Sequence, residues 1–214
     1  MTKAPTRPFG PGGDPLPAAF FGRPADRVAR DLLGADLVVR GRDGGIRRLS
    51  LVEVEAYLGA HDLACHGRTG PTKRNATMFG QAGVWYVYLC YGIHWMLNIV
   101  TGDVGQPAAV LVRGVAEIVG PGRVTKGLEI DGGFDGRPAT PETGLWIAKP
   151  AGGARWPLPA RWIERTPRIG VDYAGLWAAK PLRFVVDAGR LPRMDRAGVD
   201  PFGLARPTQP VRRR

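Results

Sequence analysis

Apolar and polar residues alternate along LVEVEAYL, from Leu51 to Leu58, which predicts a β-strand with two different faces. One face carries Val52, Val54, Ala56 and Leu58, and the other carries Leu51, Glu53, Glu55 and Tyr57. The apolar face is expected to pack into a core. The other face combines two carboxylates with a phenol, so it either meets solvent or lines a pocket.

A second alternating run, VWYVYLCYG from Val84 to Gly92, is followed at once by HWMLNIVT, and together they predict a β-hairpin. One face of its first strand holds Tyr86 and Tyr88, and the opposite face holds Trp85, Val87, Leu89 and Tyr91. The reversal is short, and Gly92 is expected to take the positive φ there. Tyr91 therefore stands at the tip, an unusual place for an aromatic ring unless it touches something.

The other periodic segments predict two helices, PADRVARDLLG from Pro24 and GPGRVTKGLEI from Gly120, and further strands at about 35–40, 46–58, 108–114, 144–149 and 182–187. We expect an α+β fold: a single domain with a curved, largely antiparallel β-sheet flanked by short helices and a protruding β-hairpin. Residues 18–190 would form this domain. Residues 1–17 are expected to be disordered, and the basic tail 191–214 is expected to be mobile.

The charge of the chain favours a polyanionic partner. Its 214 residues carry a formal charge of +11, with a pI near 10.5, and 25 of the 30 basic residues are Arg. Nucleotide bias in the genome is an alternative explanation of the Arg excess, but it does not explain the net charge.

Cysteine usage and hydropathy exclude several classes of protein. Two cysteines cannot by themselves build a zinc ribbon or hold an iron–sulfur cluster, and they indicate no disulfide framework. The chain has no run of about 18 apolar residues, and its first residues contain no hydrophobic signal segment. We expect a soluble intracellular protein with no membrane partner.

The carboxylate pair Glu53 and Glu55 admits several interpretations. An exposed strand face is the ordinary one, because charged residues are mostly exposed. A metal site is another, but no close spacing such as HExxH is present. The further ligands of such a site would be His61, Asp62 and His66. Neither Cys65 nor Cys90 sits in a recognisable nucleophile elbow, so nucleophilic catalysis by cysteine is the weakest interpretation.

Two segments are suited to phosphate groups. The Gly- and Thr-rich connection 61–83 carries several basic residues, and a loop of that length in a compact domain is more often functional than idle. The helix after Gly120 opens with free amides flanked by Arg123 and Lys126. His94 is expected either to be satisfied within the hairpin or to contact a phosphate.

Tyrosines on a polar strand face usually indicate core or interface packing. Combined with a strong positive charge, they indicate a base-stacking site. An enzyme that acts on a base within a duplex must extrude that base, and it commonly props the gap open with an inserted side chain. Tyr91 is the candidate for this insertion.

Several motifs resemble those of the alkyladenine (methylpurine) DNA glycosylases. They are VEVEAYLG, AxHGRTG, RNxxMFGxxGxxYVYxxYGxHxMxN, VLVRG, GPGRVTKGL and RIGVxxAGxWxxKPLRF. Together they cover residues 20–187 in order and with few gaps. The resemblance implies a monofunctional enzyme of base excision repair that flips a damaged purine out of double-stranded DNA, hydrolyses its bond to deoxyribose and leaves an abasic site.

By this resemblance, Glu55 is the general base for the attacking water, Arg113 helps to hold that water, and Tyr91 occupies the vacated space in the duplex. The residues expected to bind the flipped base are Tyr57, His66, Tyr88 and Asn98. The residues expected to contact the DNA backbone are Arg74, His94, Arg123 and Lys126. The resemblance implies no metal or other cofactor. The enzyme would be a monomer, cytoplasmic and nucleoid-associated in a bacterium or nuclear in a eukaryote.

Methylation at a ring nitrogen leaves a purine cationic, which weakens the glycosidic bond and attracts the base to tyrosine faces by about 1–2 kcal/mol. Ionised Glu55 would stabilise the oxocarbenium character of the sugar while it takes a proton from water. Neutral lesions such as hypoxanthine or ethenoadenine would need protonation or hydrogen bonding at the ring.

The chain departs from the family pattern at Val54, Ile93, Asp172, Tyr173 and Leu176, and these departures bear on lesion preference more than on the class of reaction. Two rival functions are a metal-dependent nuclease that uses Glu53, Glu55 and His66, and a non-catalytic module that only stacks bases.

Overall fold

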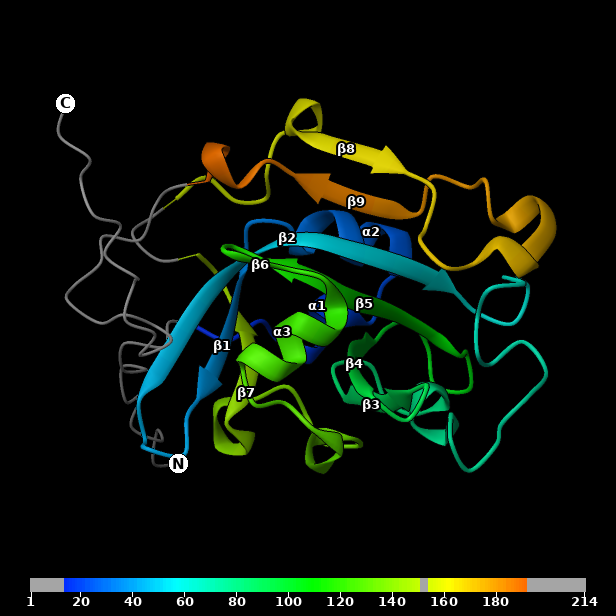
Figure 1. The fold of residues 1–214 in the computed structure, drawn as a ribbon, viewed down its shortest axis with the longest axis horizontal. Helices are drawn as coiled ribbons and strands as arrows, with labels where there is room; N and C mark the ends of the chain where they lie inside the picture. Colours follow the sequence, from blue (N-terminus) through cyan, green and yellow to red (C-terminus); the bar gives the residue numbers. More distant parts are fainter. Residues whose placement is uncertain (1–13, 151–153, 192–214) are drawn as a thin grey trace, which may run out of the picture.

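In the computed structural model, which describes residues 14–150 and 154–191, nine strands form one antiparallel sheet (Figure 1). Its main path runs through β3 (Trp85–Cys90), β4 (His94–Val100), β5 (Ala108–Val115), β2 (Ile46–Leu58), β1 (Asp36–Arg40) and β7 (Leu145–Ala148). Outside this path, β6 (Ile118–Val119) pairs with β5, and β9 (Arg183–Val186) pairs with β2 and with β8 (Ile163–Thr166). The antiparallel pairing confirms the predicted α+β class.

In the part of the chain that the structure describes, three short α-helices accompany the sheet: α1 (Ala18–Phe21), α2 (Ala25–Leu32) and α3 (Pro121–Gly127). The 3₁₀ turns among the described residues are η1 (Ala76–Phe79), η2 (Gly132–Phe134), η3 (Pro141–Thr143), η5 (Ala160–Trp162), η6 (Asp172–Trp177) and η7 (Ala188–Arg190). Pro24 is the N-cap of α2, as its fixed φ allows, and Val28 and Leu32 lie on the buried face of that helix. The sequence predicted α2 and α3, but it did not predict α1, β6 or β8.

The long strand β2 links the two halves of the sheet. Its first half pairs with β1, and its second half lies between β5 and β9. Irregular pairing on both sides of Glu53 shifts its register against β5. Such a bulge changes which face a side chain occupies. Leu51 and Val52 are consequently both buried in the main core, so the prediction that Leu51 shares the face of Glu53 is wrong.

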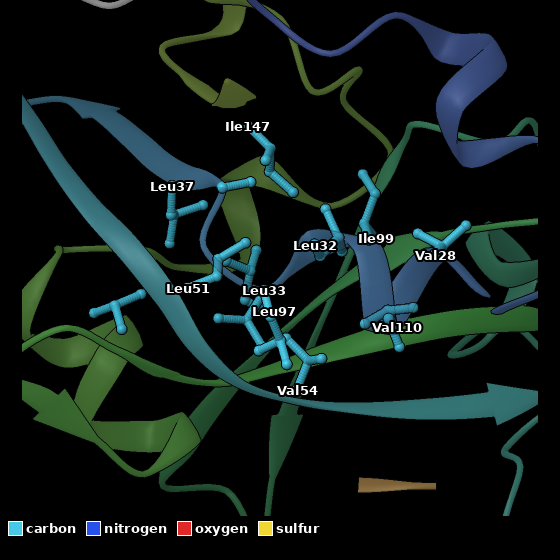
Figure 2. Close-up of a cluster of buried hydrophobic side chains, with 14 of the residues drawn as sticks. Val28, Leu32, Leu33, Leu37, Leu51, Val54, Leu97, Ile99, Val110 and Ile147 are labelled. Carbon is cyan, nitrogen blue, oxygen red and sulfur yellow. The ribbon is translucent and has the colours of Figure 1, made fainter. Parts of the chain in front are cut away.

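The main hydrophobic core lies between α2 and the sheet (Figure 2). Val28 and Leu32 meet Val54 of β2 and Val110 of β5 there, and each side chain of this size contributes about 1.5–3 kcal/mol when fully buried. Val54 faces this core, as its strand parity predicts. The core fixes β2 and β5 against each other, and these two strands carry the acidic and basic residues of the site.

The tyrosine face of the hairpin packs in a separate, smaller cluster. Tyr86 and Tyr88 lie in it, whereas Trp85 and Val87 point into the main core, which confirms the predicted parity of β3. The three-residue turn at its tip has Gly92 at φ 70°, as expected. In Figure 1 the end of β2, this hairpin and η6 gather at the right-hand side of the molecule.

The predictions for the chain ends fall largely outside the described residues. Residues 1–13 and 192–214, to which the predicted disorder and mobility mainly apply, are among those not described. Leu16 is buried and its amide donates to the carbonyl of Ile147, so ordered structure begins before the predicted boundary at residue 18. Among the described residues, no helix is long and apolar enough to cross a membrane.

Candidate active site

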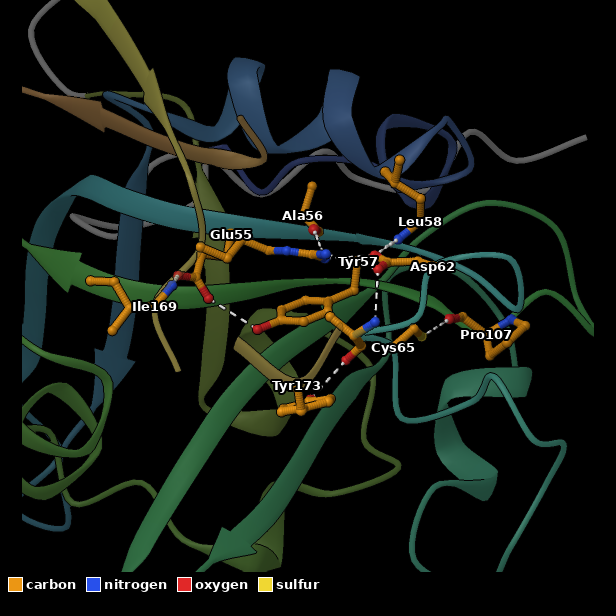
Figure 3. Close-up of polar contacts among 11 residues, drawn as sticks. Glu55, Ala56, Tyr57, Leu58, Asp62, Cys65, Pro107, Ile169 and Tyr173 are labelled. Atoms are coloured by element: carbon orange, nitrogen blue, oxygen red, sulfur yellow. Dashed lines mark hydrogen bonds and ion pairs between the residues drawn. The ribbon is translucent and has the colours of Figure 1, made fainter. Parts of the chain in front are cut away.

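Glu55 is a fully buried carboxylate in the middle of the sheet, with 0 % of its surface exposed. It lies opposite Leu111 of β5 on one side and Arg183 of β9 on the other. Its Oε1 accepts a hydrogen bond from the amide of Ile169 over 2.8 Å, and its Oε2 accepts one from the hydroxyl of Tyr57 over 3.0 Å (Figure 3). The interpretation of this strand face as solvated is therefore wrong.

Arg113 connects the two glutamates of β2. Its Nη1 lies 3.4 Å from Glu55 Oε1, and its Nε donates to Glu53 Oε1 over 2.8 Å. Arg183 of β9 donates to the same Glu53 oxygen over 2.7 Å. Burial acts to raise the pKa of Glu53, but hydrogen bonds from Arg183 and Arg113 outweigh it and hold that pKa below its usual range. Glu53 is thus an ionised anchor for Arg113.

The surroundings of Glu55 make it a stronger base than an ordinary glutamate. Burial raises the pKa of Glu55 and outweighs the opposing effects of Arg113, the Ile169 amide, the Tyr57 hydroxyl and Arg168. A carboxylate whose pKa is raised in this way accepts a proton from water more readily, while the nearby cations still favour its ionised form. This environment suits general base catalysis.

Aromatic rings line the sheet face next to Glu55. Tyr86 and Tyr88 stack with their centroids 5.2 Å apart, and His66 meets Tyr88 edge-on at 4.7 Å. The His66 Nδ1 atom lies 3.2 Å from the Tyr86 hydroxyl. Burial and the charge of Arg74 lower the pKa of His66, so its imidazole is neutral at pH 7. The structure therefore brings His66 and Tyr88 together as the sequence predicts.

Tyr57 joins this cluster from the adjacent strand. Its ring packs against the cluster that contains Tyr88, and burial followed by the charge of Glu55 raises the pKa of the Tyr57 hydroxyl well above its usual value. The hydroxyl stays protonated and remains a hydrogen-bond donor. Asn98 is buried on β4 opposite Leu111, the residue that also faces Glu55, so three neighbouring strands bring Asn98 and Glu55 to one level of the sheet.

The side chain of Asn98 has partners within the hairpin. Its Nδ2 donates to the carbonyl oxygens of Tyr86 and Met96 over 3.1 and 3.3 Å. These bonds leave the side-chain oxygen of Asn98 as its available acceptor. Arg74 is also tied to the hairpin, because it donates to the Leu89 carbonyl over 3.1 Å and lies 5.3 Å from the centre of the Tyr88 ring.

Tyr91 projects from the tip of the hairpin with 92 % of its surface exposed and φ at 49°, and its neighbour Ile93 is 72 % exposed. His94 is exposed at the start of β4, with its ring directly over Gly122 of α3, where an added Cβ would approach it to 2.9 Å. Arg123 and Lys126 are exposed on α3. The hairpin tip and the basic residues of α3 therefore belong to neighbouring parts of the surface.

Comparison with known proteins identifies the family. The family model for "Methylpurine-DNA glycosylase (MPG)" matches residues 19–119 and 116–190. The chain belongs to the methylpurine-DNA glycosylase family. It is 48 % identical over 182 residues to a Myxococcus xanthus protein named "Putative 3-methyladenine DNA glycosylase", with 80 % of this chain and 89 % of that protein covered. A Legionella pneumophila protein of the same name is 43 % identical over 179 residues, with 80 % and 93 % covered.

This membership makes the chain a DNA glycosylase that processes alkylated bases, an activity of DNA repair. The rival metal-dependent nuclease would use Glu53, Glu55 and His66 as metal ligands. Among the described residues, no group of three or more His, Cys, Asp or Glu side chains could hold a metal ion. Glu53 is bonded to Arg113 and Arg183, Glu55 to Tyr57 and the Ile169 amide, and His66 lies among the tyrosines. The further candidate ligands also have separate partners: His61 packs on Trp177, and Asp62 pairs with Arg168.

Cys65 of the glycosylase shows no sign of activation as a nucleophile. Cys65 is buried, its Sγ donates to the carbonyl of Pro107 over 3.0 Å, and burial raises the pKa of its thiol. Three residues that contact the glutamates or the tyrosines were not singled out from the sequence: Ile169, Arg168 and Arg183. The motif RIGVxxAGxWxxKPLRF contains all three, and this is the signal that could have found them.

Proposed function

We propose that this glycosylase is monofunctional, flips an alkylated purine out of duplex DNA, and hydrolyses the bond between that purine and deoxyribose to leave an abasic site for base excision repair. The observation that carries the proposal is the position of Glu55. It is a buried carboxylate with a raised pKa, bonded to Tyr57 and next to an arginine and a wall of aromatic rings. This combination suits attack by water on a sugar whose leaving group is an aromatic cation.

In the proposed reaction, Glu55 takes a proton from the attacking water, and Arg113 helps to hold that water. Arg113 is already oriented by Glu53 and stands 3.4 Å from Glu55. Because the negative charge of Glu55 also stabilises oxocarbenium character on the sugar, one residue contributes to the transition state in two ways. A purine that is cationic from alkylation departs as a neutral base and needs no general acid.

The base would lie among Tyr57, His66 and Tyr88. Stacking of a cationic purine on tyrosine faces contributes about 1–2 kcal/mol, and the neutral state of His66 avoids repulsion of that charge. The side-chain oxygen of Asn98 is the group we assign to discrimination at the purine edge. Preference for 3-methyladenine, the base in the names of the relatives, is the first specificity to test.

Tyr91 is the residue we assign to the space that the flipped nucleotide vacates. Its ring is large, almost fully exposed and held at the end of a two-stranded ribbon, as an inserted side chain requires. The backbone phosphates would meet Arg74, His94, Arg123 and Lys126. In this proposal the enzyme acts as a monomer on double-stranded DNA.

The proposal is tested with a duplex that contains one methylated purine, incubated with the protein in excess chelator. We expect free methylated base to be released and the DNA strand to stay intact until alkali cleaves the abasic site. Chelator-sensitive cutting of the strand would indicate the nuclease instead. Binding with neither product would indicate a non-catalytic module.

A further inference from the structure

Beneath Tyr57 lies a buried ion pair that the proposed chemistry does not use. The side chains of Arg168 and Asp62 both have 0 % of their surface exposed. Arg168 Nη2 donates to Asp62 Oδ1 over 2.8 Å, and its Nη1 donates to the other oxygen of Asp62. Charged side chains are rarely buried so completely unless they are paired. The pair joins two segments that are 106 residues apart in the sequence.

Asp62 shapes the turn that leads from β2 to His66. Its Oδ2 accepts a hydrogen bond from the amide of Leu58 over 3.1 Å, and its Oδ1 accepts one from the amide of Ala64 over 3.0 Å (Figure 3). The carboxylate therefore spans the end of the strand that carries Tyr57 and the start of the segment that carries His66.

Arg168 contacts both the backbone of β2 and the ring of Tyr57. Its Nη1 also donates to the carbonyl of Ala56 over 2.9 Å, and its guanidinium carbon lies 4.7 Å from the centre of the Tyr57 ring. The next residue, Ile169, is 53 % exposed, yet its amide donates to Glu55 over 2.8 Å. Because the peptide that carries this amide is adjacent to Arg168, the position of the donor depends on where Arg168 is fixed.

We propose that the Asp62–Arg168 ion pair is the positioning element of the active site: it fixes the Tyr57 ring, the His66 turn and the Ile169 amide relative to Glu55. This inference rests on the proposed role of Glu55 as general base. Arg168 and Asp62 are positioning residues, because each acts through the groups it holds. The pair also affects the ionisation of Glu55, since the charge of Arg168 lowers the pKa of that carboxyl.

Four groups oppose the effect of burial on Glu55: Arg113 from β5, the Ile169 amide, the Tyr57 hydroxyl and Arg168. Removal of the ion pair releases the Ile169 amide and eliminates the charges of both Arg168 and Asp62, which act on Glu55 in opposite directions. Loss of the Ile169 hydrogen bond and of the Arg168 charge, both of which lower the pKa of Glu55, is expected to raise that pKa. A pair that served folding alone would affect stability without moving this pKa.

The test compares two double variants. Asp62→Leu with Arg168→Met replaces the buried pair by apolar side chains, a change that in other proteins is often neutral or stabilising for the fold. The matched control is Asp36→Leu with Arg48→Met. That pair is also buried, with 2.7 Å between Arg48 Nη2 and Asp36 Oδ2, and it joins β1 to β2 away from Glu55. Arg168→Lys is a third variant, in which one amine replaces the planar fork.

Two measurements are made on the full chain: titration of the Glu55 carboxyl carbon by NMR, and the pH profile of single-turnover base release from a duplex with one methylated purine. We expect the Asp62/Arg168 double variant to titrate at higher pH than the wild type, and its maximal rate to fall about 10- to 100-fold. Arg168→Lys should change both quantities in the same direction by less. The Asp36/Arg48 control should match the wild type in both.

An unchanged Glu55 titration in folded Asp62/Arg168 and Arg168→Lys variants would overturn the inference. An equal shift in the Asp36/Arg48 control would do the same, because it would show a general response to reduced stability. The NMR titration does not depend on turnover. If the wild-type protein released no base, the proposed function would fail while the NMR titration would still decide the inference.

Discussion

Tyr57 donates its phenolic hydrogen to Glu55 over 3.0 Å from two positions further along the same strand. The period of a β-strand places both side chains on one face, and the burial of that face brings them into contact. Tyr57 therefore provides a ring to the aromatic cluster and a hydrogen bond to the carboxylate. These two contributions can be separated experimentally.

Tyr57→Phe keeps the ring and removes the hydroxyl. The hydroxyl lowers the pKa of Glu55, so its loss raises that pKa further. Because a general base works only when ionised, the acidic limb of the rate profile should move to higher pH. Tyr86→Phe is the control, since the Tyr86 hydroxyl faces His66 rather than Glu55. The acidic limb of the rate profile of this variant should stay at the wild-type pH. A limb that stayed in place for Tyr57→Phe, in a pH series of single-turnover rates, would contradict this prediction.

Glu55→Gln should stabilise the protein at pH 7. Burial raises the pKa of Glu55 above its value in the unfolded chain, so ionising this carboxyl costs more free energy in the folded state than in the unfolded state. The folded state is therefore favoured at low pH, where Glu55 is protonated, and this contribution to stability is lost as pH rises through the folded pKa. Glutamine avoids this loss. Each kcal/mol gained should raise the melting temperature by roughly 2–4 °C.

The control for this measurement is a comparison of the same two proteins at low pH. The advantage of Glu55→Gln should shrink as pH falls below the ordinary pKa of a glutamate, where the wild-type carboxyl is protonated in both the folded and the unfolded states. Thermal melts at pH 4 and pH 7 check the sign. A variant less stable than the wild type at pH 7, and relatively more stable at low pH, would refute the prediction.

Tyr91→Ala should leave the melting temperature unchanged, because 92 % of the residue is exposed. We expect it to slow base release from a fully paired duplex by about 10-fold or more, and to slow release from a mismatched or single-stranded lesion much less, since those bases are easier to extrude. Val104→Ala, at another exposed apolar position, serves as control. Equal losses on paired and unpaired substrates would remove Tyr91 from the insertion role.

The double variant Arg123→Gln with Lys126→Gln should weaken DNA binding similarly for all sequences. The logarithm of the DNA-binding constant falls linearly with the logarithm of the salt concentration, and each phosphate contact that is lost should make this slope shallower by about 0.9. The two substitutions together should make it shallower by about 2. Arg42→Gln, at an exposed position on the β1–β2 turn, is the control for the removal of one arginine charge. A salt titration in which the Arg123/Lys126 variant kept the wild-type slope would show that these residues do not meet phosphates.

Strand parity in the sequence predicted the contacts made by neighbours in the chain. Glu55 and Tyr57 share a face, as do Tyr86 and Tyr88, because the period of two holds wherever β2 and β3 are regular. It failed at Leu51, where the register shift depends on how β2 pairs with β5, and no local pattern encodes that pairing.

Contacts that come from distant parts of the chain could not be predicted in the same way. Ile169 lies 114 positions after Glu55 and contacts it through the backbone amide. Because any residue other than proline carries this amide, the identity of the side chain does not predict the contact. Arg168 looked like one of many basic residues in its segment, and only the fold shows that it is buried against Asp62. The motif RIGVxxAGxWxxKPLRF contains these residues without singling them out, and their proposed roles rest on the contacts.

The most direct measurement is single-turnover release of free methylated base by Glu55→Gln, compared with the wild type, on a duplex with one methylated purine. The substitution keeps the shape of the side chain and removes the base. We predict that release falls by at least about 10²- to 10⁴-fold, the range of a general base, while the affinity for the same duplex stays at the wild-type level. Release at the wild-type rate by Glu55→Gln would contradict the account.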